Sequence, residues 1–310
     1  MEIPFTNQLV MATNCLYRDY HVLSKNKQRD SSDTDGTRGD LAAELFTKTS
    51  SLGIRIVVCD GGSSYEFLSA VDKFTGNGLT IVSSDTPGRG PQRRSAFKAA
   101  TLLPGSRIIL YTQPEKVLDP KVISQKNYFE LVSKPILEGR ADIVIPKRNH
   151  KLFEQSYPPY MRLSELKVNR TYDRLMHGAK LMREDESFDW FFGQVVFINE
   201  PEIVALFLKE YVLSGPIRSR IGASPNPQMH SAGHYFPIIE ALFNRLRVVS
   251  VDVPFEYPAT QRANEESSER MAEFKERRLL DGAAYRLEAL HFLAFLQGDP
   301  RSKIIEIGVA

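Results

Sequence analysis

A basic, glycine-rich turn carries the clearest chemical signal in this sequence. It reads GRGPQRRSAFKAA from Gly88, and it places Arg89, Arg93 and Arg94 beside a predicted helix that begins near Pro91. The free N–H groups and the dipole of a helix N-terminus favour an anion. Positively charged side chains are unfavourable at a helix N-terminus. The negative charge of a bound diphosphate or RNA phosphate would offset the charge of these arginines. The alternative interpretation is a solvated helix face.

A second group of polar residues follows the apolar run RIILY. The next four residues are Thr-Gln-Pro-Glu, which bring Thr112, Gln113 and Glu115 to the end of a predicted strand. Mg²⁺ and Mn²⁺ prefer several oxygen ligands, most of them carboxylates. One carboxylate with neutral oxygens is therefore a poor site for either ion.

Polar residues also end the first two predicted strands. Thr13 and Asn14 close NQLVMATN, and Asp60 and Gly61 follow IRIVVC. The carboxyl ends of parallel strands open onto a common crevice, where such sheets bind ligands. Asp60 could accept hydrogen bonds from a nucleoside, with Gly61 allowing a close approach. Alternatively, it could cap the next helix or form an Asx turn.

Further candidates lie in the second half of the chain. In EDESFDWFFG, Trp190 could form an apolar wall for an acceptor ring, or the segment could be an acidic cap before a core Trp-Phe-Phe cluster. Arg148 follows a predicted strand and could line the same cleft. Glu165 and Asn169 are four residues apart and share one helix face, which could face a substrate but which we expect to be solvated.

The elements that must position these residues alternate between strands and helices. Strands are predicted at 7–14, 54–59, 79–83, 108–111, 141–146, 195–198 and 247–253. Helices are predicted at 41–51, 65–74, 92–103, 122–138, 160–181, 203–211, 236–245 and 265–297, the last broken near Gly282, with a surface loop at 24–40. This alternation predicts an α/β fold, with a mostly parallel sheet flanked by helices.

Composition adds limits to these expectations. The 310 residues carry a net charge of +2, so any basic site must be local. No apolar run is long enough to span a bilayer, and the N-terminus does not read as a secretory signal. The two cysteines suit a reducing cytosol, so we expect a cytoplasmic protein without a membrane partner. We expect one domain, with a core over 1–255 and a C-terminal helical segment over 256–310 packed on it.

The order of these pieces resembles the GT-A glycosyltransferases, in particular the family-two-like and mannosylglycerate-synthase-like branches. The motifs that carry the resemblance are LVMATN, IRIVVCDGGSS, GRGPQRRSAFKAA, RIILYTQPE, ADIVIPKR and FDWFFGQVVFI, and they cover about residues 7–255. The resemblance implies a single-domain GT-A-like fold. It also implies the transfer of a sugar from a nucleotide-sugar donor to a small hydroxylated acceptor.

The resemblance also implies roles for individual residues. The nucleotide would be held by Thr13, Asn14, Asp60 and Gly61, and the diphosphate by Arg89, Arg93, Arg94, Thr112 and Gln113. Asp189 or Glu186 would act as the base on the acceptor. The family's Asp-x-Asp metal motif is absent here. Glu115 is then a lone ligand of Mg²⁺ or Mn²⁺ or a catalytic group near phosphate, and His234 or His230 is a late ligand; otherwise no metal is used.

Two alternative interpretations stay open. The sequence also resembles fungal proteins of GT-A-like appearance, among which arginine-containing cyclodipeptide synthases join aminoacyl groups carried on tRNA. In that case the basic turn would bind an RNA phosphate, Glu115 would recognise a guanidinium, and aminoacyl-tRNA would be the partner. The third interpretation is a non-catalytic nucleotide-binding protein.

Overall fold

The computed structural model describes residues 5–23, 29–30, 32–74, 78–213, 235–266, 268–299 and 304–307. The strands are β1 (Leu9–Cys15), β2 (Arg55–Asp60), β3 (Leu79–Ser83), β4 (Ile108–Tyr111), β5 (Ile143–Arg148), β6 (Val195–Ile198), β7 (Glu210–Leu213), β8 (Val248–Val253) and β9 (Ile304–Ile307). The helices are α1 (Phe5–Gln8), α2 (Thr34–Ser51), α3 (Tyr65–Asp72), α4 (Arg89–Thr101), α5 (Gln125–Leu137), α6 (His150–Ser156), α7 (Pro159–Gly178), α8 (Pro201–Leu208), α10 (Tyr235–Phe243), α11 (Ala259–Glu265) and α12 (Ser268–Leu296).

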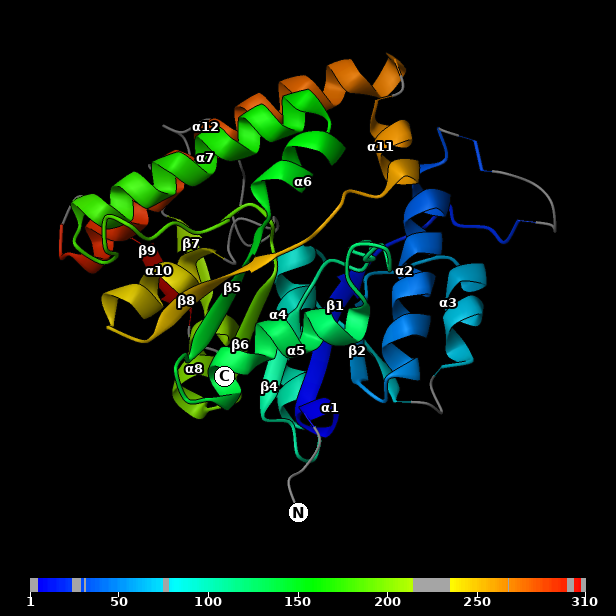
Figure 1. Ribbon diagram of the computed structural model, residues 1–310, viewed down its shortest axis with the longest axis horizontal. Coiled ribbons are helices and arrows are strands. Elements are labelled where there is room, and N and C mark those ends of the chain that lie inside the picture. Colours follow the sequence, from blue (N-terminus) through cyan, green and yellow to red (C-terminus); the bar gives the residue numbers. More distant parts are fainter. Residues whose placement is uncertain are drawn as a thin grey trace.

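Seven strands form the central sheet, in the order β3-β2-β1-β4-β6-β5-β8 (Figure 1). Neighbouring strands are parallel except at β6, which is antiparallel to both β4 and β5. In β1, Met11 lies opposite Ile56 of β2 and Leu110 of β4. The mostly parallel sheet predicted from the sequence is therefore confirmed.

Helices cover both faces of the sheet, because the strands bury side chains on both sides. Along β1, Val10 and Ala12 belong to the core that includes Phe97 of α4, while Leu9 and Met11 belong to the core on the other face. This arrangement explains why the strands are continuous apolar runs without a polar alternation.

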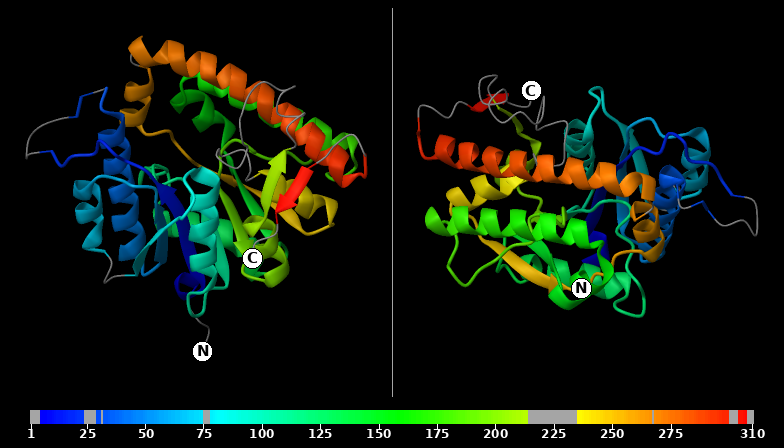
Figure 2. Two further views of the ribbon diagram at one scale, coloured as in Figure 1. Left: turned by 180° about the vertical axis from the view of Figure 1, so that it is seen from behind. Right: turned by 90° about the horizontal axis from the view of Figure 1, so that it is seen from above.

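Two long helices lie across the end of the sheet toward which β1 runs. α7 and α12 are side by side in all three ribbon views (Figures 1 and 2). The hydroxyl of Tyr172 on α7 donates a hydrogen bond to the carbonyl of Tyr285 on α12 over 2.9 Å. These helices therefore place side chains above the ends of the strands.

The start of α2 corrects the loop predicted at 24–40. The helix begins at Thr34, and a side-chain oxygen of Asp33 accepts a hydrogen bond of 2.8 Å from the N–H of Gly36. This helix cap satisfies an N–H group that the first turn leaves without a partner. The sequence analysis missed it because this turn is polar and contains glycine.

Other boundaries also differ from the predictions. α12 runs from Ser268 to Leu296 without the break predicted near Gly282. The helix predicted at 203–211 ends at Leu208, and the chain continues into β7, which pairs with β9 in a separate antiparallel sheet. By contrast, β3, β4 and β6 have the bounds predicted from the sequence.

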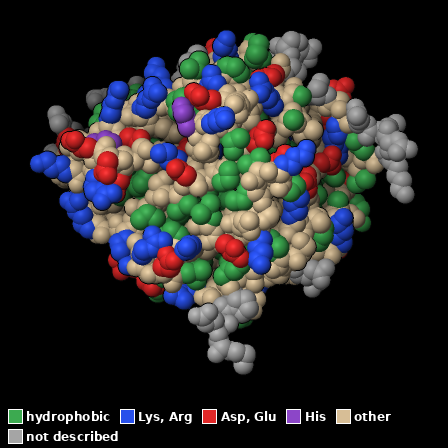
Figure 3. All heavy atoms as spheres, viewed as in Figure 1, with side chains coloured by type: hydrophobic (Ala, Val, Ile, Leu, Met, Phe, Trp, Pro, Cys, Tyr) green, Lys and Arg blue, Asp and Glu red, His purple; other side chains and the backbone are tan. Residues whose placement is uncertain are grey.

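The surface has mixed charge, as the net charge of +2 suggests. Figure 3 shows acidic and basic side chains interspersed over one face of the molecule. A search of the described helices finds none with the length and apolar character that a membrane span requires.

Candidate functional site

The carboxyl ends of β1 and β4 open into a cavity of about 430 Å³, which we call the sheet-edge cavity. Its other walls come from α2, the start of α4, and from α7, α11 and α12. Four residues predicted from the sequence line it: Asn14, Arg89, Gln113 and Glu115. The remaining described candidates do not line it: Thr13, Asp60, Gly61, Arg93, Arg94, Thr112, Arg148, Glu186, Asp189 and Trp190.

One end of the cavity is the N-terminus of α4. Gly88 precedes the helix with a φ of 117°, a left-handed value that glycine adopts readily, and it provides no side-chain cap. The backbone N–H of Gln92 already bonds to the carbonyl of Gly88. The earlier N–H groups of the first turn have no partner within the helix. With the exposed side chain of Arg89, they make this end of the cavity positive.

The three arginines of the basic turn point in different directions. Arg93 is buried, and its guanidinium lies 5.8 Å from the centroid of the Tyr111 ring. Burial lowers the pKa of Arg93. Arg94 approaches Glu210 of β7 at 3.7 Å. Only Arg89 of the three therefore reaches the cavity wall.

Beside Arg89, three polar side chains form a connected wall. The hydroxyl of Tyr111 donates to Asn14 over 2.9 Å, and the Asn14 amide donates to Gln92 over 3.4 Å. All three line the cavity. A Cβ on Gly61 would lie 2.2 Å from Nε2 of Gln92, so the glycine makes room for that side chain and not for a ligand.

Three polar candidates at the strand ends have structural partners. The Thr13 hydroxyl donates to the carbonyl of Thr112 over 2.7 Å, and the Thr112 hydroxyl accepts a hydrogen bond from Gln194 over 2.8 Å. Asp60 accepts hydrogen bonds from the N–H groups of Gly62 and Ser63. These contacts are those of an Asx turn, in which the Asp60 side chain binds the backbone that follows it.

A second part of the lining, which we call the carboxylate-rich end, contains Glu115, Glu165 and Glu265 together with the cations Arg38 and Lys116. Glu115 accepts a hydrogen bond of 3.1 Å from Tyr17, and Glu265 of α11 accepts one of 2.7 Å from Tyr257. Arg38 approaches Glu265 at 3.4 Å. Burial first, and then the nearby carboxylates, raise the pKa of Tyr17 and of Tyr257, so both phenols stay protonated.

Gln261 adds an open hydrogen-bond acceptor to this end. Its side chain is 7% exposed and lines the cavity. Nε2 donates to Glu265 over 3.3 Å, while Oε1 has no hydrogen-bond partner. A buried acceptor without a partner is costly, so a ligand that donates a hydrogen bond would stabilise this site.

Lys116 follows Glu115 and also lines the cavity. Its Nζ lies 5.2 to 5.8 Å from the ring centroids of Tyr157, Phe192, Phe255 and Tyr257. Burial, and next the charge of Arg148, lower the pKa of Lys116 to about 8.

Arg148 forms the most buried ion pairs of the region. Its Nε and Nη2 donate to Asp189 over 2.6 and 2.7 Å, and Nη1 donates to Glu165 over 2.7 Å. The amide of Asn169 also donates to Asp189 over 2.9 Å. Burial alone would raise the pKa of Asp189, but Arg148 outweighs it and the pKa is lowered.

This geometry corrects the roles predicted for the second half of the chain. Asp189 is 6% exposed and is held by Arg148, so its place is structural and not that of a base facing the cavity. Trp190 is 1% exposed and donates to Asp173 over 2.9 Å, which is the core alternative and not an acceptor wall. Glu165 is buried and lines the cavity, so the solvated face expected for it is wrong.

Two further predictions concern loop residues. Glu186 accepts a hydrogen bond from the N–H of Arg183 and lies in the turn after α7, away from the cavity. His234 and His230 lie outside the described residues.

The described residues do not fit Mg²⁺ or Mn²⁺. Among them, no three His, Cys, Asp or Glu side chains gather in a group that could hold a metal ion. Around Glu115, the nearest predicted ligand groups are Thr112 and Gln113, and the Thr112 hydroxyl is already engaged. Hard cations need more oxygen ligands than this.

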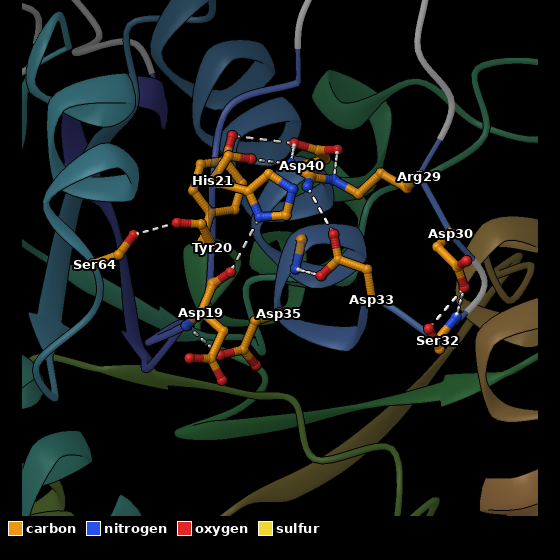
Figure 4. Close-up of polar contacts among 11 residues, drawn as sticks. Asp19, Tyr20, His21, Arg29, Asp30, Ser32, Asp33, Asp35, Asp40 and Ser64 are labelled. Atoms are coloured by element: carbon orange, nitrogen blue, oxygen red, sulfur yellow. Dashed lines mark hydrogen bonds and ion pairs between the residues drawn. The ribbon is translucent and has the colours of Figure 1, made fainter.

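The start of α2 is held by its own cluster, shown in Figure 4. Arg29 donates to Asp40 over 2.6 Å and to Asp33 over 2.9 Å, and Tyr20 donates to Asp40 over 3.1 Å. This cluster fixes the first turns of α2, and Arg38 follows on the same helix. The cavity therefore receives one of its cations from a segment predicted to be a loop.

Sequence reasoning missed several cavity residues, among them Arg38, Gln92, Lys116, Gln261 and Glu265. Gln92 and Lys116 lie within or next to motifs that were singled out, so their position was available as a signal. Arg38, Gln261 and Glu265 come from helices that reach the site only through the tertiary fold.

No protein-family model matches this sequence, and a comparison with curated proteins finds no match. Among solved structures, S. aureus TarS 1-349 is similar over 94% of this chain and 71% of its own, with 12% identity and a TM-score of 0.41. The same protein in complex with UDP has 13% identity and a TM-score of 0.40, over 94% of this chain and 70% of its own.

A second similar structure is 4-diphosphocytidyl-2C-methyl-D-erythritol synthase from Anaerococcus prevotii. It has 13% identity and a TM-score of 0.42, over 86% of this chain and 99% of its own. These values describe a similarity in chain arrangement, and they assign neither a family nor a reaction to this chain.

Proposed function

We propose that the protein is a transferase that binds a nucleotide-linked donor, such as a nucleotide sugar, in the sheet-edge cavity and moves the donor's group to a small hydroxylated acceptor. One observation carries the proposal. The cavity joins the positive N-terminus of α4 to the ends of β1 and β4, and so brings together Asn14, Arg89, Gln113 and Glu115. Open α/β sheets bind ligands at such an edge.

The donor belongs at the end formed by α4. Arg89 and the free N–H groups of the first turn suit a diphosphate, which carries several anionic oxygens. Asn14 and Gln92 lie beside them and offer amide groups to a base or a ribose.

The acceptor belongs at the carboxylate-rich end. Glu115 and Glu265 accept hydrogen bonds from tyrosines, and the buried Oε1 of Gln261 has no partner among the described residues. Hydroxyl groups of a small acceptor are suitable donors for them, and such contacts would orient the acceptor toward the donor.

The transfer is proposed to proceed without a divalent cation. The described residues include no group of three His, Cys, Asp or Glu side chains for such an ion, and the Thr112 hydroxyl near Glu115 is already engaged by Gln194. Arg89 and the dipole of α4 would instead stabilise the charge that develops on the leaving phosphate.

Thermal unfolding with UDP-, GDP- and dTDP-sugars tests this proposal. A ligand that binds only the folded chain, at about 100 times its Kd, stabilises it by about 2.7 kcal/mol. At least one nucleotide sugar should raise Tm, and the increase should persist with EDTA present. If none of the three nucleotide classes raises Tm with or without Mn²⁺, the proposal is wrong.

A second candidate is an aminoacyl-tRNA-dependent, arginine-containing cyclodipeptide synthase. The observation that favours it is the gathering of Glu115, Glu165 and Glu265 at one end of the cavity, because paired carboxylate oxygens suit a guanidinium. Incubation with tRNA, synthetases, ATP and amino acids tests it. A cyclic dipeptide that disappears after RNase treatment would support this candidate, and no dipeptide in an active charging mixture would contradict it.

A further inference from the structure

Lys116 lines the cavity and is half-buried among aromatic rings, whereas most lysine side chains end in water. Its ammonium lies among four aromatic rings, and the nearest of their centroids, that of Phe255, is 5.2 Å away. Its hydrogen bond to the Tyr157 hydroxyl is long, at 3.4 Å. Among the described residues, none of the ion pairs includes Lys116.

The charges that face Lys116 come from several elements. Glu115 precedes it, while Glu165 of α7 and Glu265 of α11 favour its charged form from beyond ion-pair distance. Arg148 of β5 opposes that form, and its guanidinium lies 4.7 Å from the Tyr157 ring that Lys116 also faces.

Burial and Arg148 outweigh the three carboxylates. The pKa of Lys116 is lowered to about 8, with burial as the largest cause. The rings compensate for only part of the lost hydration, because they lie more than 5 Å from Nζ. About a tenth of this amine is therefore neutral at pH 7, and about half of it near pH 8.

We propose that Lys116 is the proton acceptor for the nucleophilic group of the second substrate in the sheet-edge cavity. This inference rests on the proposed transferase function and names a residue for its chemical step. The geometry that supports it is the place of Lys116 in the cavity lining, which it shares with Glu115, Glu165 and Glu265. Among the described residues, the one hydrogen bond of its Nζ is the long contact with Tyr157.

With a hydroxylated acceptor, the transfer forms one C–O bond and breaks another. The acceptor oxygen attacks the donor carbon and forms a new C–O bond, while its proton passes to the neutral Nζ of Lys116. The C–O bond between the donor carbon and the phosphate breaks, and its electron pair leaves with the phosphate. The resulting ammonium then returns its proton to water.

Three buried carboxylates of this region are less suited to that role, while Glu115 accepts a hydrogen bond from Tyr17 and also lines the cavity. Asp189 does not line the cavity, and its oxygens accept hydrogen bonds from Arg148 and Asn169. Glu165 holds Arg148, and Glu265 accepts hydrogen bonds from Tyr257 and Gln261. Protonation of any of these groups would disturb the contacts that hold the wall together.

Competitive acetylation of the full chain with acetic anhydride, followed by peptide mass spectrometry, tests the inference without requiring activity. The reference groups are Lys126 and Lys134, whose side chains are 59% and 67% exposed. We expect the labelling of Lys116 to rise with a midpoint near pH 8, about two units below the ordinary value for a lysine side chain. A midpoint near that ordinary value, or no labelling up to pH 9, would overturn the proposal.

A second measurement separates a base from a simple positive charge. Lys116→Met and Lys116→Arg should each release UDP from UDP-glucose at least about 100 times more slowly, with the affinity for UDP within about twofold of the wild type. The control is Lys134→Met. Turnover in Lys116→Arg close to the wild-type rate would overturn the role. If UDP does not bind while the acetylation midpoint is near 8, the proposed donor is wrong and the reactive amine stands.

Discussion

At the scale of single residues, Arg148 is a buried cation that forms ion pairs with two carboxylates. The guanidinium bonds to Asp189 and Glu165, and its flat face lies 4.1 Å from the centroid of the Phe153 ring. Arg148 was expected to line the acceptor cleft. It instead holds Glu165, which lines the cavity, and Asp189, which does not.

Arg148→Met should destabilise the protein by about 3–5 kcal/mol, because it leaves Asp189 and Glu165 buried without their cation. Asp189 has a lowered pKa, so its contribution to stability is present above the pKa of the unfolded chain and is lost as the pH falls through the folded pKa. Urea unfolding at pH 7 measures the effect of the substitution, and a series from about pH 4 downward follows the loss of the Asp189 contribution, because the folded pKa lies below the ordinary value. A variant as stable as the wild type at pH 7 would contradict this account.

Lys116 has the opposite effect on stability. Lys116→Met should raise the free energy of unfolding by about 1–2 kcal/mol at pH 7, because methionine fills the aromatic surroundings without a charge to bury. Below about pH 8 the lysine is protonated in the folded and the unfolded chain, and its burial cost is fully present.

The advantage of the methionine variant should shrink at higher pH. Between about pH 8 and the ordinary lysine range, the folded chain releases the proton before the unfolded chain does, so wild-type stability rises relative to the variant. Urea unfolding at pH 7 and 9.5 provides the comparison. A pH-independent difference would show that the folded pKa is not lowered.

Arg89 is the cation that reaches the donor end of the cavity. Arg89→Ala should weaken the binding of UDP about tenfold, since a charge-assisted hydrogen bond at a partly exposed site is lost. Titration calorimetry at 0.15 M salt measures the change. Arg140→Ala is the matched control, because Arg140 is exposed, pairs with Glu138 and does not line the cavity. Equal weakening in both variants would indicate non-specific attraction.

At the scale of elements, α2 depends on the contacts at its first turn. Asp33 caps the helix and also binds Arg29. Asp33→Ala should therefore cost about 1 kcal/mol, or somewhat more if the Arg29 contact adds to the cap. Urea unfolding measures the loss, and Asp72→Ala, near the end of α3, serves as an exposed comparison.

The elements also show how far the sequence could be interpreted. Apolar runs predicted the strands well, because a strand buried on both faces has no polar alternation to confuse it. The start of α2 was missed, since its helix is specified by one cap and by contacts with Tyr20 and Arg29 and not by an apolar stripe.

The candidate site was predictable where one residue at a strand end suffices, as for Asn14 and Glu115. It was not predictable where partners are distant in sequence. Tyr17 meets Glu115 across 98 positions and Arg148 meets Asp189 across 41. Which polar residue faces the cavity and which holds the wall depends on such pairs.

At the scale of the whole molecule, the sheet-edge cavity is lined by charges of both signs in a protein of net charge +2. Arg89 lies at the N-terminus of α4, while Glu165 of α7 and Glu265 of α11 lie near Lys116. In the proposed transfer, a donor with a diphosphate would lie against Arg89, and an acceptor with hydrogen-bond donors would lie against the carboxylates.

A crystal structure of the protein with UDP, GDP or dTDP, whichever matches the nucleotide sugar that raises Tm, tests this account most directly. We predict that the diphosphate lies at the N-terminus of α4, with its oxygens about 3 Å from the N–H groups of Arg89 and Gly90. The account is contradicted if that nucleotide occupies another surface, or if the cavity stays without nucleotide at a saturating concentration.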